Sequence, residues 1–311
     1  MNAMVATNQT PRPRTESSRG RAAALPLELL LASDGSPAAV AATRVVSLLA
    51  SRWSVSPHAV TIVPSPSVAF DPVGINVAYS PALEEELARD VRSQLAAACS
   101  GTSVWSHEMS VGSPANEIVR IAGQRASDLI VLGLRPHAFL DRVFRDETAL
   151  SVMRHATVPV LAVTPLLEGL PRRIAVAIDF SRASIAAARA ALDLIDTGGS
   201  LVLVYVEPPA EPLTEDGEGY GTIYAQGVSA AFTRLRQELA SRDDVGLETV
   251  VLHGNVVPEL LSFADRADVD VLAVGSQRHS IARRAFVGGV TTALARSAAK
   301  SLFVIPPGRR A

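Results

Sequence analysis

One pattern occurs twice in this chain, and the duplication constrains the fold more than any other feature. An apolar run that begins at an aspartate and ends at a glycine occupies residues 128–133 and again residues 270–275. The closing glycines are separated by 275 − 133 = 142 residues. A second glycine pair, Gly112 and Gly254, has the same separation of 142 residues. Matching landmarks at a constant spacing predict an internal repeat.

A third landmark shows that the repeat extends through most of the chain. Short apolar runs lead into Asp34 and into Asp179, which are 145 residues apart. Because the other two landmarks are 142 residues apart, the segment between this acid and the glycine landmarks is three residues shorter in copy two than in copy one. A period this long indicates two tandem domains of ordinary size and not a solenoid of short repeats. We term them copy one and copy two. The predicted segments are a disordered N-terminal tail at 1–25, copy one at 26–164, a linker at 165–171 and copy two at 172–307.

Within each copy, short apolar runs alternate with longer amphipathic segments. The runs are typical of strands in a parallel sheet buried on both faces, and the segments are typical of the helices that cover it. We therefore predict an α/β fold of two tandem, doubly wound, parallel five-stranded sheets with helices on both faces. Expected elements include a strand at 103–109, with Gly112 in the turn that follows it, and a helix at 225–242.

Composition excludes several classes of protein. Of the 311 residues, 48% are hydrophobic and 19% are charged, so each copy can bury a core. The formal net charge of −2 argues against a nucleic-acid binder, which needs a basic face. Cys99 is the single cysteine, and no apolar run approaches the ~18–20 residues of a membrane span. We expect a cytoplasmic protein that binds neither nucleic acid nor membrane.

Copy two also contains two adjacent glycines after the apolar run that ends at Gly275. Gly288 and Gly289 lie where the last helix begins, and free N–H groups at a helix start attract anions. Glycine there would let a phosphate approach closely, and Arg278 adds positive charge. The same pair is equally consistent with a tight turn, so both interpretations stay open.

Copy one differs at the corresponding place. Gly133 is retained, but Pro136 follows it and the last helix begins near Asp146 and Glu147. Carboxylates at a helix start satisfy its free N–H groups and repel a phosphate. We therefore expect copy one to be a degenerate site that does not bind phosphate.

Several short motifs carry a resemblance to a known family. Besides the two apolar runs that end at glycine, they are residues 34–36, 111–112, 154–163, 179–181 and 253–254. In this order they resemble the universal stress protein family in its tandem two-domain form. The resemblance implies a Rossmann-like fold and a role in the stress response. It also implies that the copies pair as a pseudo-dimer through 158–163 and 302–305, and homodimers of the whole chain are a further expectation.

Nucleotide-binding members of this family carry a glycine, two residues, a second glycine, nine residues, and a third glycine followed by serine or threonine. Copy two matches this motif at Gly275 and Gly288, whereas Arg278 and Gly289 depart from it. Thr291 is close enough in sequence to supply the missing hydroxyl. The resemblance thus implies ATP or ADP as a candidate ligand of copy two only.

Two further residues have both a functional and a structural interpretation. By resemblance, Asp179 corresponds to an acid near the adenine and ribose, but it also fits a strand-end turn that caps the next helix. His253 could face the same site, or it could be an ordinary structural histidine. The candidate cofactor-binding residues are Asp179, His253, Gly254, Gly275, Arg278, Gly288, Gly289 and Thr291.

Two functions remain open from the sequence. The first is a regulatory protein of the stress response that docks to an unknown protein partner without nucleotide. The alternative is an adenine-nucleotide protein that uses copy two, with at most slow hydrolysis. We find no catalytic constellation in the sequence, and its six histidines lack the spacing of metal ligands.

Overall fold

The computed structural model describes residues 28–64, 81–98, 105–135, 146–207, 209, 217–276, 289–297 and 299–307. The predicted tail at 1–25 lies outside these residues, as do Cys99, Pro136, Arg278 and Gly288. Within the described ranges, no helix is long and apolar enough to cross a membrane.

Among the described residues, five strands and four helices alternate strictly in each copy. The elements of copy one are β1 (Leu29–Ala32), α1 (Pro37–Trp53), β2 (His58–Pro64), α2 (Pro81–Ala98), β3 (Ser106–Gly112), α3 (Pro114–Gln124), β4 (Leu129–Gly133), α4 (Asp146–His155) and β5 (Val160–Val163). Those of copy two are β6 (Arg173–Ile178), α5 (Arg182–Leu194), β7 (Ser200–Glu207), α6 (Gly217–Leu239), β8 (Gly246–His253), α7 (Val256–Arg266), β9 (Val271–Gly275), α8 (Gly289–Ser297) and β10 (Ser301–Ile305).

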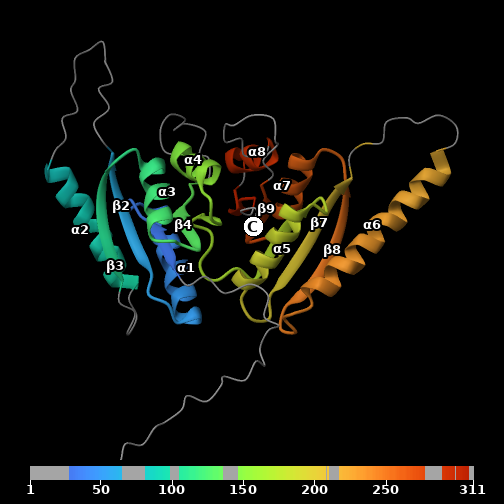
Figure 1. The fold of residues 1–311 in the computed structure, drawn as a ribbon, viewed down its shortest axis with the longest axis horizontal. Coiled ribbons are helices and arrows are strands. Elements are labelled where there is room, and N and C mark those ends of the chain that lie inside the picture. Colours follow the sequence, from blue (N-terminus) through green and yellow to red (C-terminus); the bar gives the residue numbers. More distant parts are fainter. Residues whose placement is uncertain are drawn as a thin grey trace, which may run out of the picture.

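The ten strands form one continuous sheet in the order β3-β2-β1-β4-β5-β10-β9-β6-β7-β8. Neighbouring strands within a copy are parallel, and β5 and β10 are antiparallel to each other. The prediction of two doubly wound, five-stranded parallel sheets is therefore confirmed. Figure 1 shows the copies side by side, with α4 and α8 adjacent across the junction.

The junction between the copies, termed the seam, follows a pseudo-twofold axis. Val160 lies opposite Val304, and Leu161 lies opposite Phe303. Because 161 + 142 = 303, Leu161 faces its own equivalent at the centre of the seam. Next to this strand pair, the Thr164 N–H donates to the Ser301 hydroxyl at 3.0 Å. The predicted pairing of 158–163 with 302–305 is thus present in the structure.

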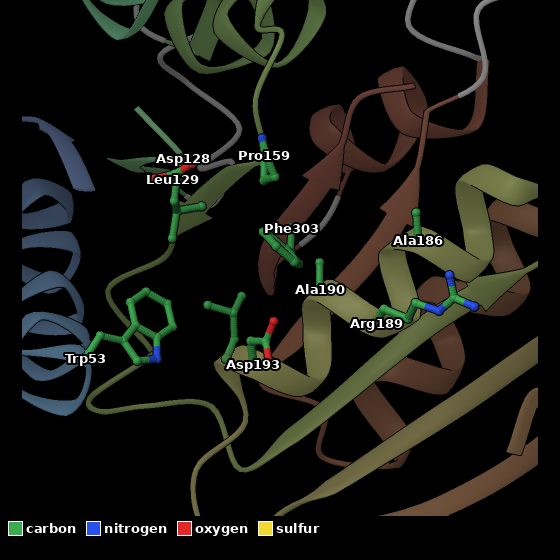
Figure 2. A pocket seen from close by; sticks show the side chains of 10 residues that line it. Trp53, Asp128, Leu129, Pro159, Ala186, Arg189, Ala190, Asp193 and Phe303 are labelled. Carbon is green, nitrogen blue, oxygen red and sulfur yellow. The ribbon is translucent and has the colours of Figure 1, made fainter. Parts of the chain in front are cut away.

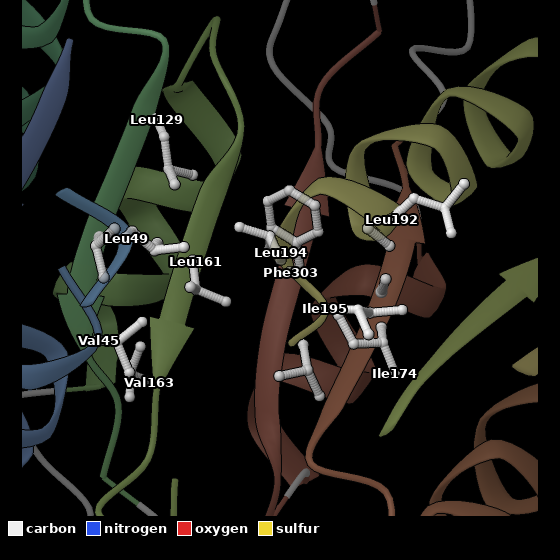
Figure 3. Packing of buried hydrophobic residues seen from close by; sticks show 14 of the residues in the cluster. Val45, Leu49, Leu129, Leu161, Val163, Ile174, Leu192, Leu194, Ile195 and Phe303 are labelled. Atoms are coloured by element: carbon white, nitrogen blue, oxygen red, sulfur yellow. The ribbon is translucent and has the colours of Figure 1, made fainter. Parts of the chain in front are cut away.

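Two hydrophobic clusters cover the two faces of the sheet, and each contains residues of both copies. The first takes its helical residues from α1, α2, α5 and α6, and the second takes them from α3, α4, α7 and α8. In the first cluster, Leu161 and Val163 of copy one pack together with Ile174 and Phe303 of copy two (Figure 3). The copies therefore share a core in addition to a sheet.

Two predicted element boundaries are wrong. The strand expected at 103–109 is Ser106–Gly112, because β3 follows β2 in register from Ser106 to Gly112, and Gly112 belongs to the strand. β3 is a polar edge strand, so its hydrophobicity marked its position poorly. The helix expected at 225–242 is Gly217–Leu239. Its first turns contain three glycines, which are weak helix formers.

Candidate functional site

Ligands of doubly wound sheets bind beyond the carboxyl ends of the strands, where the strand order reverses. In copy one this point lies between β1 and β4. The described residues there enclose a cavity of about 840 Å³, lined by the ends of β1, β2 and β4 and by parts of α1 to α4. The sequence motifs predict a ligand site in copy two only, and they do not predict a cavity of this size in copy one.

Polar groups of copy one at the rim of this cavity are engaged in local structure. The Asp34 carboxylate accepts the Ser36 N–H at 3.0 Å, and the Ser36 hydroxyl accepts the Ala39 N–H at 3.3 Å. The Ser33 hydroxyl donates to Gln94 of α2 at 2.8 Å. These bonds form the turn and the N-cap that start α1.

Asp179 occupies the matching position in copy two, at the end of β6. Its Oδ1 accepts the Ser181 N–H at 3.0 Å, and the Ser181 hydroxyl caps α5 by accepting the Ser184 N–H at 3.2 Å. Burial is the largest single influence and would raise the pKa of Asp179, but hydrogen bonds from Ser181 and Ser184 together lower it. The carboxylate thus has a structural task in the strand-end turn, which matches one of the two interpretations drawn from the sequence.

A carboxylate lies in the first turn of α3. Glu117 accepts the Ser110 hydroxyl at 2.8 Å and pairs with Arg120 at 2.7 Å, and both interactions lower its pKa. A Cβ added at Gly112 would lie 2.9 Å from the Glu117 Cγ, so the turn requires glycine there. Copy two repeats the contact between glycine and glutamate, because a Cβ at Gly254 would lie 3.2 Å from Glu259, but it carries Leu252 and Ser262 in place of Ser110 and Arg120. A carboxylate at this place disfavours an incoming anion.

His253 lies at the solvent-exposed end of β8. Its side chain is 75% exposed, and its Nδ1 is 3.1 Å from the carboxylate of Glu207 on β7. The next residue, Gly254, donates its N–H to the Glu207 carbonyl at 2.9 Å. The structure therefore brings His253 and Gly254 together at the strand ends, with the imidazole beside an acid.

Gly275 and Gly133 are both required by close helix packing. A Cβ at Gly275 would lie 2.2 Å from the carbonyl group of Ala183 in α5. A Cβ at Gly133 would lie 2.6 Å from the carbonyl carbon of Ala38 in α1. The presence of glycine at both positions is thus explained by the contact between strand and helix, without a ligand.

The start of α8 differs from that of α4. α8 begins at Gly289 with no acid in its first turn, and a Cβ added there would meet no described atom within 4 Å. Thr291 is only 3% exposed, so its side chain faces the interior. α4 begins at Asp146, whose side chain lies outside the described part of the structure. Packing among the described residues therefore does not require glycine at 289.

An aromatic cluster in copy two was missed by the sequence analysis. Phe180, directly after Asp179, packs against Tyr205 of β7 and Phe232 of α6, with ring centroids 5.4 Å and 5.1 Å apart. The Tyr205 hydroxyl also bonds to the hydroxyl of Tyr224. Burial and this hydrogen bond raise the pKa of Tyr205 to about 12. The sequence does hold one sign of this cluster: at the 145-residue spacing, Phe180 of copy two aligns with Gly35 of copy one, so an aromatic residue replaces a glycine.

The described residues contain no group of three or more His, Cys, Asp or Glu side chains that could hold a metal ion. At the strand ends of copy one, the hydroxyl of Ser151 on the cavity lining is 3.3 Å from the His155 Nδ1, and this nitrogen is also 2.8 Å from the Ser151 carbonyl oxygen.

Comparison with known proteins agrees with this architecture. The universal stress protein family model matches residues 28–164 and again residues 171–306. A universal stress protein of Methanocaldococcus jannaschii is 30% identical over 138 residues, which cover 44% of this chain and 81% of that protein.

Two solved structures share the tandem fold. A universal stress protein of Archaeoglobus fulgidus has a TM-score of 0.65 at 18% identity and covers 90% of this chain and 98% of its own. A Pseudomonas aeruginosa protein of unknown function has a TM-score of 0.58 at 15% identity, covering 91% of this chain and 93% of its own. With the family model matched twice and the Rossmann-like sheet present in both copies, this chain belongs to the universal stress protein family as a tandem two-domain member.

Proposed function

We propose that this protein is a regulatory component of the stress response in the cytoplasm that acts by docking to a protein partner without bound nucleotide. The observation that carries this proposal is the carboxylate beside the turn after the third strand of each copy, Glu117 in copy one and Glu259 in copy two. These groups oppose a polyphosphate at the helix N-termini that would otherwise attract it.

The cavity of copy one supports the same proposal. Its described lining is mainly aliphatic, with hydroxyls from serine and threonine and with Asp34 and Arg135 as its charged residues. Such a lining suits an uncharged group, for example an apolar side chain of a partner. The partner itself, and any homodimer of the whole chain, belong to this proposal.

The alternative is ATP or ADP bound in copy two only, and one observation favours it. A Cβ at Gly289 would meet no described atom, and the first turn of α8 holds no acid, so the N–H groups of this helix are not opposed by a carboxylate of their own helix. Since the described residues position no base there, we expect any hydrolysis to be slow.

Mass spectrometry of small molecules released from the denatured protein separates the two functions. The matched control is Gly289→Glu, which copies Glu147 of copy one because 289 − 142 = 147. We expect no stoichiometric nucleotide from either protein and no calorimetric signal with Mg–ATP. Nucleotide near one equivalent, lost in Gly289→Glu, would overturn the proposal and establish the alternative.

A further inference from the structure

A cleft distinct from both strand-end regions lies at the seam. It has a volume of about 300 Å³ and is lined by α1 and the starts of β4 and β5 in copy one, and by α5 and β10 in copy two. Figure 2 shows Trp53 on one side of this cleft, with Phe303, Ala190 and Asp193 on the other. Both copies are therefore needed to build it, and its volume lies at the lower end of small-molecule sites.

The indole N–H of Trp53 is an unused donor in this cleft. Its Nε1 atom is buried and has no hydrogen-bond partner among the described residues. A buried donor without an acceptor is costly, so buried donors in native proteins are nearly always paired. This N–H therefore calls for an acceptor that the described residues do not supply.

Asp193 supplies a carboxyl group in the same cleft. It makes no hydrogen bond or ion pair within the described part of the chain, and burial, as the largest influence, raises its pKa. The two cations that oppose this effect, Arg242 and Arg52, donate to backbone carbonyls at the end of α5, including that of Ile195 at 3.0 Å and 2.7 Å. Asp193 thus has no direct partner among the described residues, and Arg242 and Arg52 act on its charge from a longer range.

The other charged groups of the cleft are already engaged. Arg189 pairs with Glu238 at 2.7 Å, and the Asp128 carboxylate accepts the Glu28 N–H at 3.1 Å. The lining therefore carries two carboxylates, Asp128 and Asp193, against one guanidinium, Arg189, which is itself paired with Glu238.

The polar pair of the cleft is not a remnant of the duplication. At the spacing of 145 residues, Asp193 corresponds to Leu48, and Trp53 corresponds to Gly198. Neither copy therefore carries both groups, and they meet only where α1 of one copy faces α5 of the other.

We propose that the seam cleft binds a small organic cation with a flat apolar body, such as a protonated aromatic amine. Its ammonium group bonds to Asp193, its ring lies against the partly exposed Pro159 and Ala190, and an acceptor atom on the ring receives the Trp53 N–H. This site is independent of the proposed regulatory docking and of the strand-end regions.

The test uses the full-length protein with Trp105→Phe, which leaves Trp53 as its single tryptophan. Tyramine is the probe, because it combines an ammonium group, a flat ring and a phenol oxygen. The readout is the indole N–H signal in the ¹⁵N-labelled protein by NMR. We expect a saturable downfield shift with tyramine, weaker binding of phenethylamine, which lacks the oxygen, and no binding of 3-(4-hydroxyphenyl)propionate, which carries a negative charge.

Substitutions assign the two contacts. Asp193→Asn should weaken tyramine binding by about tenfold or more, whereas Leu48→Asn at the equivalent place on α1 should leave it unchanged. Trp53→Phe, measured by calorimetry, should also weaken it and provides a second variant if Asp193→Asn fails to fold. An indole signal that does not move at millimolar tyramine, or a shift equal in the Asp193→Asn variant, would overturn the proposal.

Discussion

The two copies have the same backbone conformation at the end of their first strand, but different side chains surround it. Gly35 in copy one has a φ of +72°, and Phe180 at the equivalent position in copy two has a φ of +58°. Copy one uses glycine in this left-handed conformation beside an open cavity. Copy two tolerates a phenylalanine there because its ring packs on Tyr205 and Phe232. Duplication has thus preserved the frame while the two strand-end regions have diverged.

The largest expected effect comes from breaking the seam that holds the two copies in one frame. Val160 and Val304 are each 1% exposed and lie opposite each other. Val160→Asp combined with Val304→Asp would bury two like charges, each at a cost of several kcal/mol, against a typical stability of about 5–15 kcal/mol. We expect loss of cooperative thermal unfolding and of compactness by size-exclusion chromatography.

The control for the seam is Val160→Thr combined with Val304→Thr, which keeps the side-chain shape without adding charge. It should unfold cooperatively at a lower temperature than the native protein. Native-like melting of the double aspartate variant would mean that the copies do not depend on β5 and β10 for their stability.

A second experiment tests a feature that both copies share, the close packing of a strand-end glycine against a helix. Gly275→Ala and Gly133→Ala should each destabilise the protein by about 1–3 kcal/mol or more, with the larger effect at Gly275, because the added methyl group meets helix backbone at shorter distance there. Gly289→Ala should change the free energy of unfolding by less than about 0.5 kcal/mol, because it meets no described atom. Denaturant unfolding measures all three, and equal effects at the three sites would contradict the packing argument.

The fold could be predicted from the sequence because its evidence is repeated and local. Continuous apolar strands, helices capped by Ser36 and Ser181, and landmarks at constant spacing each occur twice. β3 was misplaced because its residues are polar, and only pairing with β2 sets its register. Tertiary pairing of this kind leaves little trace in a single strand.

The candidate site was harder to predict, because the presence of a glycine in a sequence can have several structural or functional explanations. Gly275 fits a phosphate-binding motif, yet the backbone of Ala183 alone accounts for it. The cavity of copy one depends on small residues dispersed over several elements, so no local motif marks it. Arg278 and Gly288 lie outside the described residues, and their roles remain predictions.

A smaller effect is expected when the local difference between the copies is removed. Phe180→Gly gives copy two the residue of copy one. It removes the cost of a positive φ in a non-glycine residue, about 1 kcal/mol, but also the packing of a half-buried ring, worth more than that. We expect a net loss of about 1–2 kcal/mol in the free energy of unfolding. A more stable variant would mean that backbone strain outweighs the aromatic cluster.

The smallest effect concerns two histidines on the edge of copy one. The His58 Nδ1 is 2.7 Å from the Ser106 hydroxyl, and the His107 Nε2 is 3.0 Å from that of Thr61. Burial, as the largest influence, lowers the pKa of both, and Arg125 near His58 and Arg92 near His107 lower it further. The folded state therefore favours the neutral form of both imidazoles.

The sign of the pH dependence follows from these shifts. Below the unfolded-state pKa of about 6.5, the unfolded chain binds protons at these histidines while the folded chain does not, so the free energy of unfolding decreases as the pH falls until the lowered folded-state pKa is passed. By sheet register, copy two carries Val202 and Thr249 at these places. His58→Val with His107→Thr should therefore flatten the decrease in the free energy of unfolding, measured with denaturant, between about pH 7.5 and about pH 5.5. If the pH dependence of the free energy of unfolding is unchanged in the double variant, other groups cause the acid sensitivity. The edge strands of the two copies would then not differ in this respect.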